Sequence, residues 1–279
     1  MQQAIEFHGL PAVRLVAPDG ASAVVTRHGA HVVSWRTPDG VEQLYLSERS
    51  GYAPGKAIRG GIPVIFPQFA TFGPLPRHGF ARTAAWEAIG SEAPSGAAAA
   101  FRLAATPATR ALWPHDFEAT VVVTVGAARL EVALQVANSG GTGFAFSAAL
   151  HTYLRVPDIA AVRVTGLAGC GYRDQAANGR ECLQAGAPVA IDGEVDRIYR
   201  AVAAPLRVLA GDRSVEVTAE GFSDVVLWNP GPEKCAQLDD MPPDGFRRML
   251  CIEAAAIEPP VSVAAGACWS GRQTLVAGM

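Results

Sequence analysis

The chain has 279 residues, 49% of them hydrophobic, and a formal net charge of −3 at pH 7. A chain of this length buries roughly three quarters of its surface on folding, so it needs neither a metal ion nor disulfides for a stable core. The slightly acidic balance argues against a nucleic-acid or membrane-surface partner, because either would favour a basic face.

The N-terminal segment lacks a basic stretch followed by an apolar one, and the chain has no run of about 18 apolar residues. We therefore expect no signal peptide, no membrane span and a cytoplasmic location. The five cysteines are odd in number and show no C-x-x-C spacing, which argues against a disulfide framework and a zinc knuckle. We expect small buried thiols in a reducing compartment.

Short β-rich segments separated by turns dominate the chain. The 29 glycines and 20 prolines are spread throughout, which leaves few stretches long enough for a helix. Near the N-terminus, Ala23–Thr26 and His31–Thr37 are expected to be strands on either side of a turn. Turn signals recur roughly every 8–12 residues, which is typical of an all-β sandwich or barrel.

Residues 57–82, AIRGGIPVIFPQFATFGPLPRHGFAR, form the most informative segment. It has neither helical nor strand periodicity over its length, and structureless loops this long are usually functional. Arg59 and Arg82 bracket it, and Gly79 beside His78 lets the backbone bend close to a ligand. A loop with fixed positive charges, aromatic rings and a histidine suits a small polar or anionic ligand.

The middle of the chain continues the β pattern. The alanine-rich stretch Ser95–Ala105 is the best helix candidate, although its FRLA portion reads equally well as a strand. Thr120–Val125 and Arg129–Asn138 flank Gly126–Ala128 and predict a hairpin. Alternating apolar side chains from Leu130 onward give the second strand a strict period of two. Further strands are expected at Ser214–Thr218 and Trp269–Ala277.

Three polar residues interrupt apolar segments later in the chain. His151 lies in SAALHTYLRV, where an apolar run meets a polar triplet, as at a strand end that faces a cleft. Asp224 precedes the apolar VVLW segment, and Glu253 lies within MLCIEAAAI. A carboxylate in such surroundings costs several kcal/mol unless it is paired. Each acid is therefore either tied to an arginine such as Arg247 or a general base with a tuned pKa.

Other kinds of site are weakly represented. The chain contains no nucleophile elbow, P-loop, dinucleotide fingerprint or H-E-x-x-H motif. A metal site built from His78, His151, Asp224 and Glu253 is chemically possible, but their wide spacing in the sequence neither supports nor excludes it. We expect no metal and no cofactor.

Five segments resemble, in order, the aldose 1-epimerase superfamily, and more closely its hexose-6-phosphate mutarotase branch. They are KAIRGGIPVIFPQF at 56–69, HGFAR at 78–82, ALHTYLRV at 149–156, SDVVLWNP at 223–230 and DGFRRMLCIEAA at 244–255. Each segment is modest alone, but five in the family's order are highly specific. The stretch Thr165–Pro188 matches no segment that assigns it a role.

The resemblance implies an all-β fold, a twisted antiparallel β-supersandwich of the galactose mutarotase type with few short helices. We expect residues 1–279 to form a single domain and the protein to be a monomer. The resemblance also implies interconversion of the α and β anomers of an aldohexose 6-phosphate, with glucose 6-phosphate as the expected substrate. The site roles that it implies are His151 as general acid, Glu253 as general base, Asp224 and His78 as sugar-hydroxyl ligands, Arg59 and Arg82 near the phosphate, and Gln68 as a further contact.

These roles agree with the chemistry that anomer exchange requires. One proton leaves the C1 hydroxyl, another reaches the ring oxygen, the ring opens, and it closes on the other face. An acid–base pair suffices, each member contributing typically 10²–10⁴-fold. A 6-phosphate is a dianion, which suits forked guanidinium donors.

Three alternatives stay open at this point. The enzyme would act on unphosphorylated aldoses if the arginines reflect composition alone, since only two of the 23 basic residues are lysines. A non-catalytic sugar-binding sandwich would need no acid–base pair. A glycosidase would use Asp224 and Glu253 as its two carboxylates.

Overall fold

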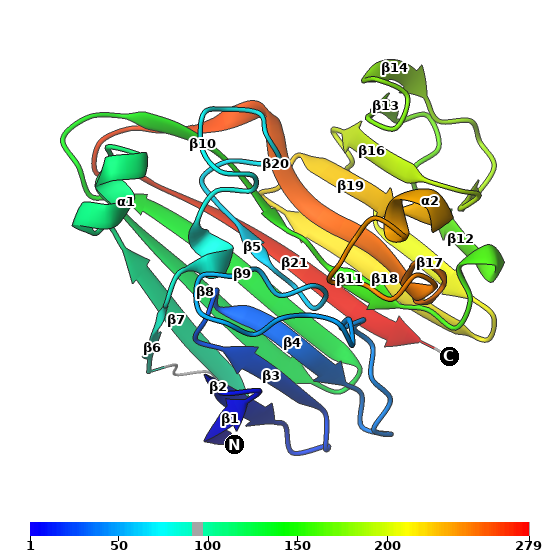
Figure 1. Cartoon of the computed structure of the whole chain (residues 1–279), viewed down its shortest axis with the longest axis horizontal. Coiled ribbons are helices and arrows are strands. Elements are labelled where there is room, and N and C mark those ends of the chain that lie inside the picture. The colour runs from blue at the N-terminus through cyan, green and yellow to red at the C-terminus, as the bar shows by residue number, and fades with distance from the viewer. Residues whose placement is uncertain (91–96, 279) are drawn as a thin grey trace.

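The computed structural model describes residues 1–90 and 97–278 (Figure 1). Within these residues the strands form three sheets, and all pairings between strands are antiparallel. The expected all-β antiparallel fold is therefore confirmed. No helix in the described residues is both long and apolar enough to cross a membrane.

The smallest sheet lies at the N-terminal end of the chain. Its order is β1 (Gln2–Phe7), β2 (Leu10–Val16), β3 (Ser22–Thr26) and β4 (His31–Arg36). The strands β3 and β4 match the segments predicted around a turn at residues 27–30. The first three residues of β4 are all buried, so protein covers both faces of the strand there.

The remaining strands of the described residues form two large sheets. One runs in the order β14 (Arg180–Leu183), β13 (Gly171–Asp174), β16 (Val195–Arg200), β19 (Asp224–Asn229), β20 (Met249–Val263), β10 (Phe144–Leu150) and β5 (Val64–Ile65), with β11 (Tyr153–Arg155) also paired to β20. The other runs in the order β15 (Val189–Ala190), β12 (Val162–Thr165), β17 (Leu206–Ala210), β18 (Arg213–Glu220), β21 (Cys268–Gly278), β9 (Arg129–Asn138), β8 (Phe117–Gly126), β7 (Ala98–Ala104) and β6 (Glu87–Ile89).

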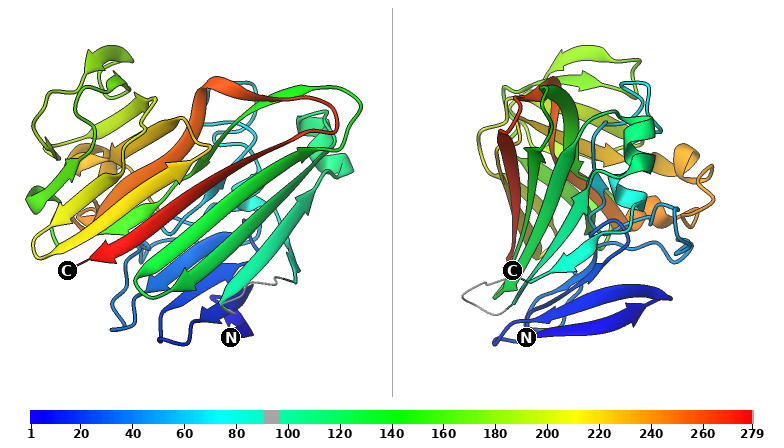
Figure 2. Two further views of the ribbon diagram at one scale, coloured as in Figure 1. Left: turned by 180° about the vertical axis from the view of Figure 1, so that it is seen from behind. Right: turned by 90° about the vertical axis from the view of Figure 1, so that its left-hand side faces the viewer.

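The two large sheets pack face to face across the main core. That core joins Val121 and Leu134 of the longer sheet to Leu150 and Ile252 of the other. Figure 2 shows the long strands β8, β9 and β21 as one twisted layer. Burying apolar side chains between two sheets is the main stabilising term of such a sandwich.

Helices are few and short in the described residues. They are α1 (Pro107–Leu112), α2 (Gly231–Cys235) and the 3₁₀ turns η1 (Ala81–Thr83), η2 (Ile159–Ala161) and η3 (Gly245–Arg248). The helix candidate Ser95–Ala105 is wrong where it is described, because residues 98–104 form strand β7; residues 95 and 96 lie outside the described residues. Both faces of this strand are buried, so alanine fills tight space in a sheet.

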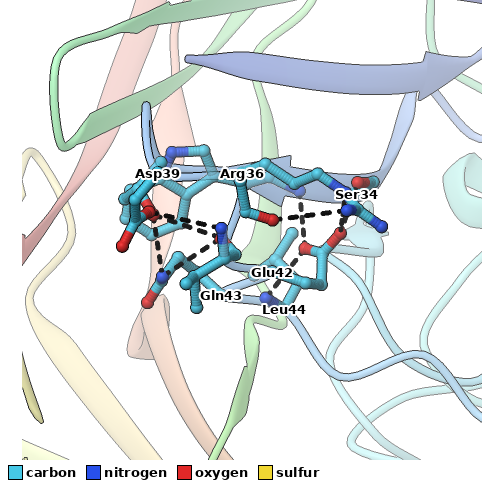
Figure 3. A network of polar contacts seen from close by, with 10 residues as sticks. Ser34, Arg36, Asp39, Glu42, Gln43 and Leu44 are labelled. Carbon is cyan, nitrogen blue, oxygen red and sulfur yellow. Dashed lines mark hydrogen bonds and ion pairs between the residues drawn. The ribbon is translucent and has the colours of Figure 1, made fainter. Parts of the chain in front are cut away.

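A polar network fixes the chain after β4 (Figure 3). Glu42 accepts hydrogen bonds from the backbone of Trp35 at 2.8 Å and Leu44 at 3.1 Å, and from the Ser34 hydroxyl at 2.5 Å. The following residues run beside the arginine-bearing loop, where Gly61 N donates to Tyr45 O at 2.7 Å. The network therefore positions the backbone that supports one wall of the candidate site.

All five cysteines are free thiols. The prediction of buried thiols is correct for Cys235 and Cys251 and wrong for Cys268, which is exposed. Cys170 and Cys182 are half-buried.

Candidate active site

A cavity of about 460 Å³ gathers most of the predicted site residues. Its lining includes Arg59, His78, Arg82, His151 and Glu253. These come from the loop at 57–82, from the end of β10 and from the middle of β20. The structure thus brings together residues that lie up to 194 positions apart in the sequence.

His151 and Glu253 lie against each other in the cavity wall. His151 Nε2 is 3.3 Å from Glu253 Oε1, and their side chains are only 10% and 1% exposed. Glu253 belongs to β20, which lies between β19 and β10 in its sheet, and it pairs with Val226 of β19. The His151 ring stacks on the Tyr153 ring at 4.8 Å, which fixes its orientation.

Burial sets the protonation of this pair. Burial raises the pKa of Glu253 well above its ordinary value, and burial together with nearby His78 and Arg59 lowers the pKa of His151. Both shifts favour the uncharged forms, a protonated carboxyl group beside a neutral imidazole. Neither Glu253 Oε2 nor His151 Nδ1 has a hydrogen-bond partner among the described residues.

His78 lies beside this pair and is also neutral. Its ring is 5.6 Å from the His151 ring, and burial, then Arg82, lowers the pKa of His78 to about 2. Its Nδ1 accepts the backbone N–H of Ala70 at 3.2 Å, so the ring proton is on Nε2. His78 can therefore donate one hydrogen bond to a ligand.

The arginines of the loop form a positive wall. Arg59 holds both carboxylate oxygens of Asp240 at 3.1 Å and donates to the Tyr153 hydroxyl at 3.0 Å. Arg82 donates to the Arg77 carbonyl at 3.0 Å, and its buried Nε has no partner in the described part of the chain. Burial, with Arg59 and Arg77 nearby, lowers the pKa of Arg82. The unpartnered Nε of Arg82 therefore leaves a hydrogen-bond donor that an anion could use.

Two glycines let the loop at 57–82 pack closely against neighbouring backbone. A side chain at Gly61, where φ is +62°, would meet Val32 O at 2.3 Å. One at Gly79, where φ is +66°, would meet Phe66 O at 2.3 Å. At Gly79 the absence of a side chain therefore lets the backbone pack closely against residue Phe66.

Two predicted ligands do not line the cavity. Gln68 closes its own loop by donating to Leu75 O at 3.0 Å and accepting from Leu75 N at 2.9 Å. Asp224 Oδ2 accepts the backbone N–H groups of Ile257 at 2.8 Å and Glu258 at 3.1 Å. Both side chains therefore make hydrogen bonds within the protein, and neither is among the residues that line the cavity.

The cavity also contains residues that sequence reasoning missed. Asp196 of β16 lines it, and burial raises the pKa of this carboxyl group to about 6. Trp228, Phe69 and Arg77 line it too. Asp196 stands in EVDRIYR, a charged stretch that looks like a solvated strand, whereas Trp228 lay within a segment already singled out.

Comparison with known proteins identifies the family to which this chain is similar. The family model described as "Aldose 1-epimerase" matches residues 11–275. Curated relatives in Cenchrus ciliaris and Escherichia coli K12, each named "Putative glucose-6-phosphate 1-epimerase", are 35% and 36% identical; the alignments cover 96% and 81% of this chain and 85% and 77% of theirs. The crystal structure of a "putative mutarotase" from Salmonella typhimurium superposes with a TM-score of 0.91 at 30% identity, over 99% of this chain and 93% of that one.

Proposed function

We propose that this chain, which belongs to the aldose 1-epimerase family, exchanges the anomers of an aldohexose 6-phosphate with His151 and Glu253 as its acid–base pair. The family establishes an isomerase that acts on the anomeric carbon of sugars. The finer claim rests on one observation above all: a buried His–Glu pair, 3.3 Å apart, faces the same cavity as Arg59 and Arg82.

In the proposed mechanism one proton moves between the two members of the pair. When that proton passes from Glu253 to His151 Nε2, the pair becomes a carboxylate base and an imidazolium acid with no change in total charge. Glu253 then removes the C1 hydroxyl proton while His151 protonates the ring oxygen, and the C1–O5 bond breaks. After rotation about C1–C2, the reverse transfers close the ring on the other face and restore the pair.

The walls of the cavity account for substrate binding. The faces of Trp228 and Phe69 suit the apolar face of a sugar ring, and His78 Nε2–H suits a hydroxyl oxygen. Arg82 has an unused buried donor, and a phosphate oxygen would supply the missing acceptor. Asp196 faces the same space and is a further candidate for a hydroxyl contact.

The alternatives receive less support. A sugar-binding module has no use for a buried acid–base pair. The glycosidase hypothesis pairs Glu253 with Asp224, but Asp224 is held by backbone N–H groups and does not line the cavity. The choice between phosphorylated and free aldoses depends on the arginines.

The experiment is to measure anomer exchange by NMR on glucose 6-phosphate and on glucose with the same enzyme preparation. We expect strong acceleration on the phosphate and a weaker effect on glucose. Arg59→Ala is expected to slow only the phosphorylated substrate. Exchange at the buffer rate on both sugars would reject the enzyme, and equal rates on both would reject the phosphate assignment.

A further inference from the structure

We propose that His151, Cys251 and Glu253 form a site for a zinc-like divalent cation, and that the bound cation inhibits anomer exchange. One ligand atom from each of the three lies within 4.8 Å of the other two, and all three residues are buried. Cys251 has no part in the proton transfers proposed above. The inhibitory consequence rests on the proposed function, whereas the site itself rests on geometry.

Local structure explains why a thiol stands beside the acid–base pair. Cys251 and Glu253 are two residues apart on β20, so their side chains leave the same face of the strand. At this level Cys251 is flanked by its cross-strand partners Tyr153 and Trp228, which hold the thiol on that face. His151 precedes Tyr153 and projects onto the same patch, 3.3 Å from Glu253.

The distances suit a tetrahedral ion. Zinc bonds of about 2.0 Å to nitrogen or oxygen and 2.3 Å to sulfur place neighbouring ligand atoms roughly 3.3–3.8 Å apart. His151 Nε2 and Glu253 Oε1 already have this separation. The sulfur lies no more than 4.8 Å from the other two ligand atoms, so binding an ion would draw it closer to them.

The donor set also balances the charge of the ion. A thiolate, a carboxylate and a neutral imidazole cancel a divalent charge, so the loaded site buries no net charge. Glu253 Oε2 is buried and has no partner among the described residues, which leaves an acceptor unsatisfied until a cation or a substrate arrives. Such an orphaned carboxylate oxygen is a second indication of a ligand.

The cavity provides entry and a fourth position. His151 and Glu253 line the cavity, whereas Cys251 lies behind them, so an ion held by all three keeps one open face toward the cavity. A water molecule or a sugar hydroxyl would complete the tetrahedron. The ion would occupy His151 Nε2 and the Glu253 carboxylate, the groups that must exchange a proton during turnover.

The test uses Co²⁺ as a spectroscopic probe and Zn²⁺ as an inhibitor of the full chain. Metal-free protein titrated with Co²⁺ should develop a thiolate-to-metal absorption band, and Zn²⁺ should slow anomer exchange until a chelator is added. In Cys251→Ala we expect the band to vanish and the inhibition constant for Zn²⁺ to rise at least about tenfold. Metal-free exchange by this variant should stay within about twofold of the parent.

A matched control is Cys235→Ala, which removes another buried thiol from the same cluster. It should keep both the band and the inhibition. The proposal is overturned if the parent shows no thiolate band, if the band survives in Cys251→Ala, or if Zn²⁺ inhibits both proteins equally. A parent that binds Co²⁺ through Cys251 but never accelerates exchange would reject the proposed function and keep the metal site.

Discussion

The Thr152 hydroxyl donates a 2.5 Å hydrogen bond to Oε1 of Gln273, a residue of the opposite sheet. Gln273 Nε2 in turn donates to Ile252 O at 3.0 Å, and Ile252 N donates to Thr152 O at 3.0 Å. This closed ring joins the residues next in sequence to His151 and Glu253. It therefore ties the spacing of the acid–base pair to the packing of the two large sheets.

Replacing Gln273 by leucine should slow turnover more than it weakens substrate binding. Leucine fills similar space but leaves the Thr152 hydroxyl and the Ile252 carbonyl unpartnered, at about 1–3 kcal/mol each. If the ring sets the geometry of the pair, kcat should fall about tenfold with little change in KM. Steady-state anomer exchange and thermal unfolding would be measured together. A lower Tm with kcat intact would mean that the ring serves the fold alone.

Glu253→Gln should abolish catalysis without unfolding the protein. The amide keeps the size of the side chain but cannot take the C1 hydroxyl proton, so exchange should fall by about 10²–10⁴-fold. His151→Asn should act similarly by removing the acid. Glu258→Gln is the matched control, since it lies on the same strand and pairs with Arg173 at 2.5 Å outside the cavity. Measurable catalysis by Glu253→Gln at the parent rate would exclude this residue as the base.

Arg82→Gln should discriminate between substrates. The change removes a half-buried cation that lines the cavity and has a buried, unpartnered Nε, so only a ligand with an anionic group loses a contact. Hydrogen bonds to charged groups contribute about 1.5–3 kcal/mol, which predicts a KM for glucose 6-phosphate roughly 10–100-fold higher. Kinetics on free glucose provide the internal control and should not change. A parallel loss on both sugars would place Arg82 in the scaffold.

Asp224→Ala should destabilise the fold and leave KM nearly unchanged. Its carboxylate accepts hydrogen bonds from two backbone N–H groups, the buried one of Ile257 and the half-buried one of Glu258, and it does not line the cavity. Leaving them unpaired costs about 1–3 kcal/mol, which chemical denaturation would detect. Asp224→Asn, which keeps one acceptor oxygen, should recover part of the loss. A raised KM at full stability would instead restore the sugar contact expected from the sequence.

The sequence predicted most where a residue pattern has one structural meaning. Strict alternation from Arg129 to Asn138 predicted β9 with its observed bounds, whereas β13 and β14, at residues 171–183, show no clear alternation between buried and exposed positions. His151 and Glu253 could be recognised from the sequence because burying a polar side chain within an apolar segment costs free energy unless the side chain has a partner. The hydrogen-bond partners of Asp224 could not be recognised from the sequence, because they are backbone N–H groups, which every residue except proline has.

Asp196 gives the protein a stability that depends on pH. Burial raises its folded-state pKa from 3.8 to about 6, so between these values the folded protein holds a proton that the unfolded chain has released. Unfolding then becomes easier as pH rises from about 4 to about 6, and the penalty stays constant above that range. Asp196→Asn carries no charge and should escape it.

Relative to the parent, Asp196→Asn should therefore be about 1–2 kcal/mol more stable at pH 8 and no more stable near pH 4. This range discounts the full pKa difference because the side chain is partly exposed. Thermal unfolding followed from pH 4 to pH 8 would show the two melting curves separating by a few degrees as the pH rises. The exposed Asp192→Asn, four residues earlier, is the control and should track the parent throughout. A constant offset between the Asp196→Asn and parent melting temperatures would show that the carboxyl group at position 196 does not titrate in this window.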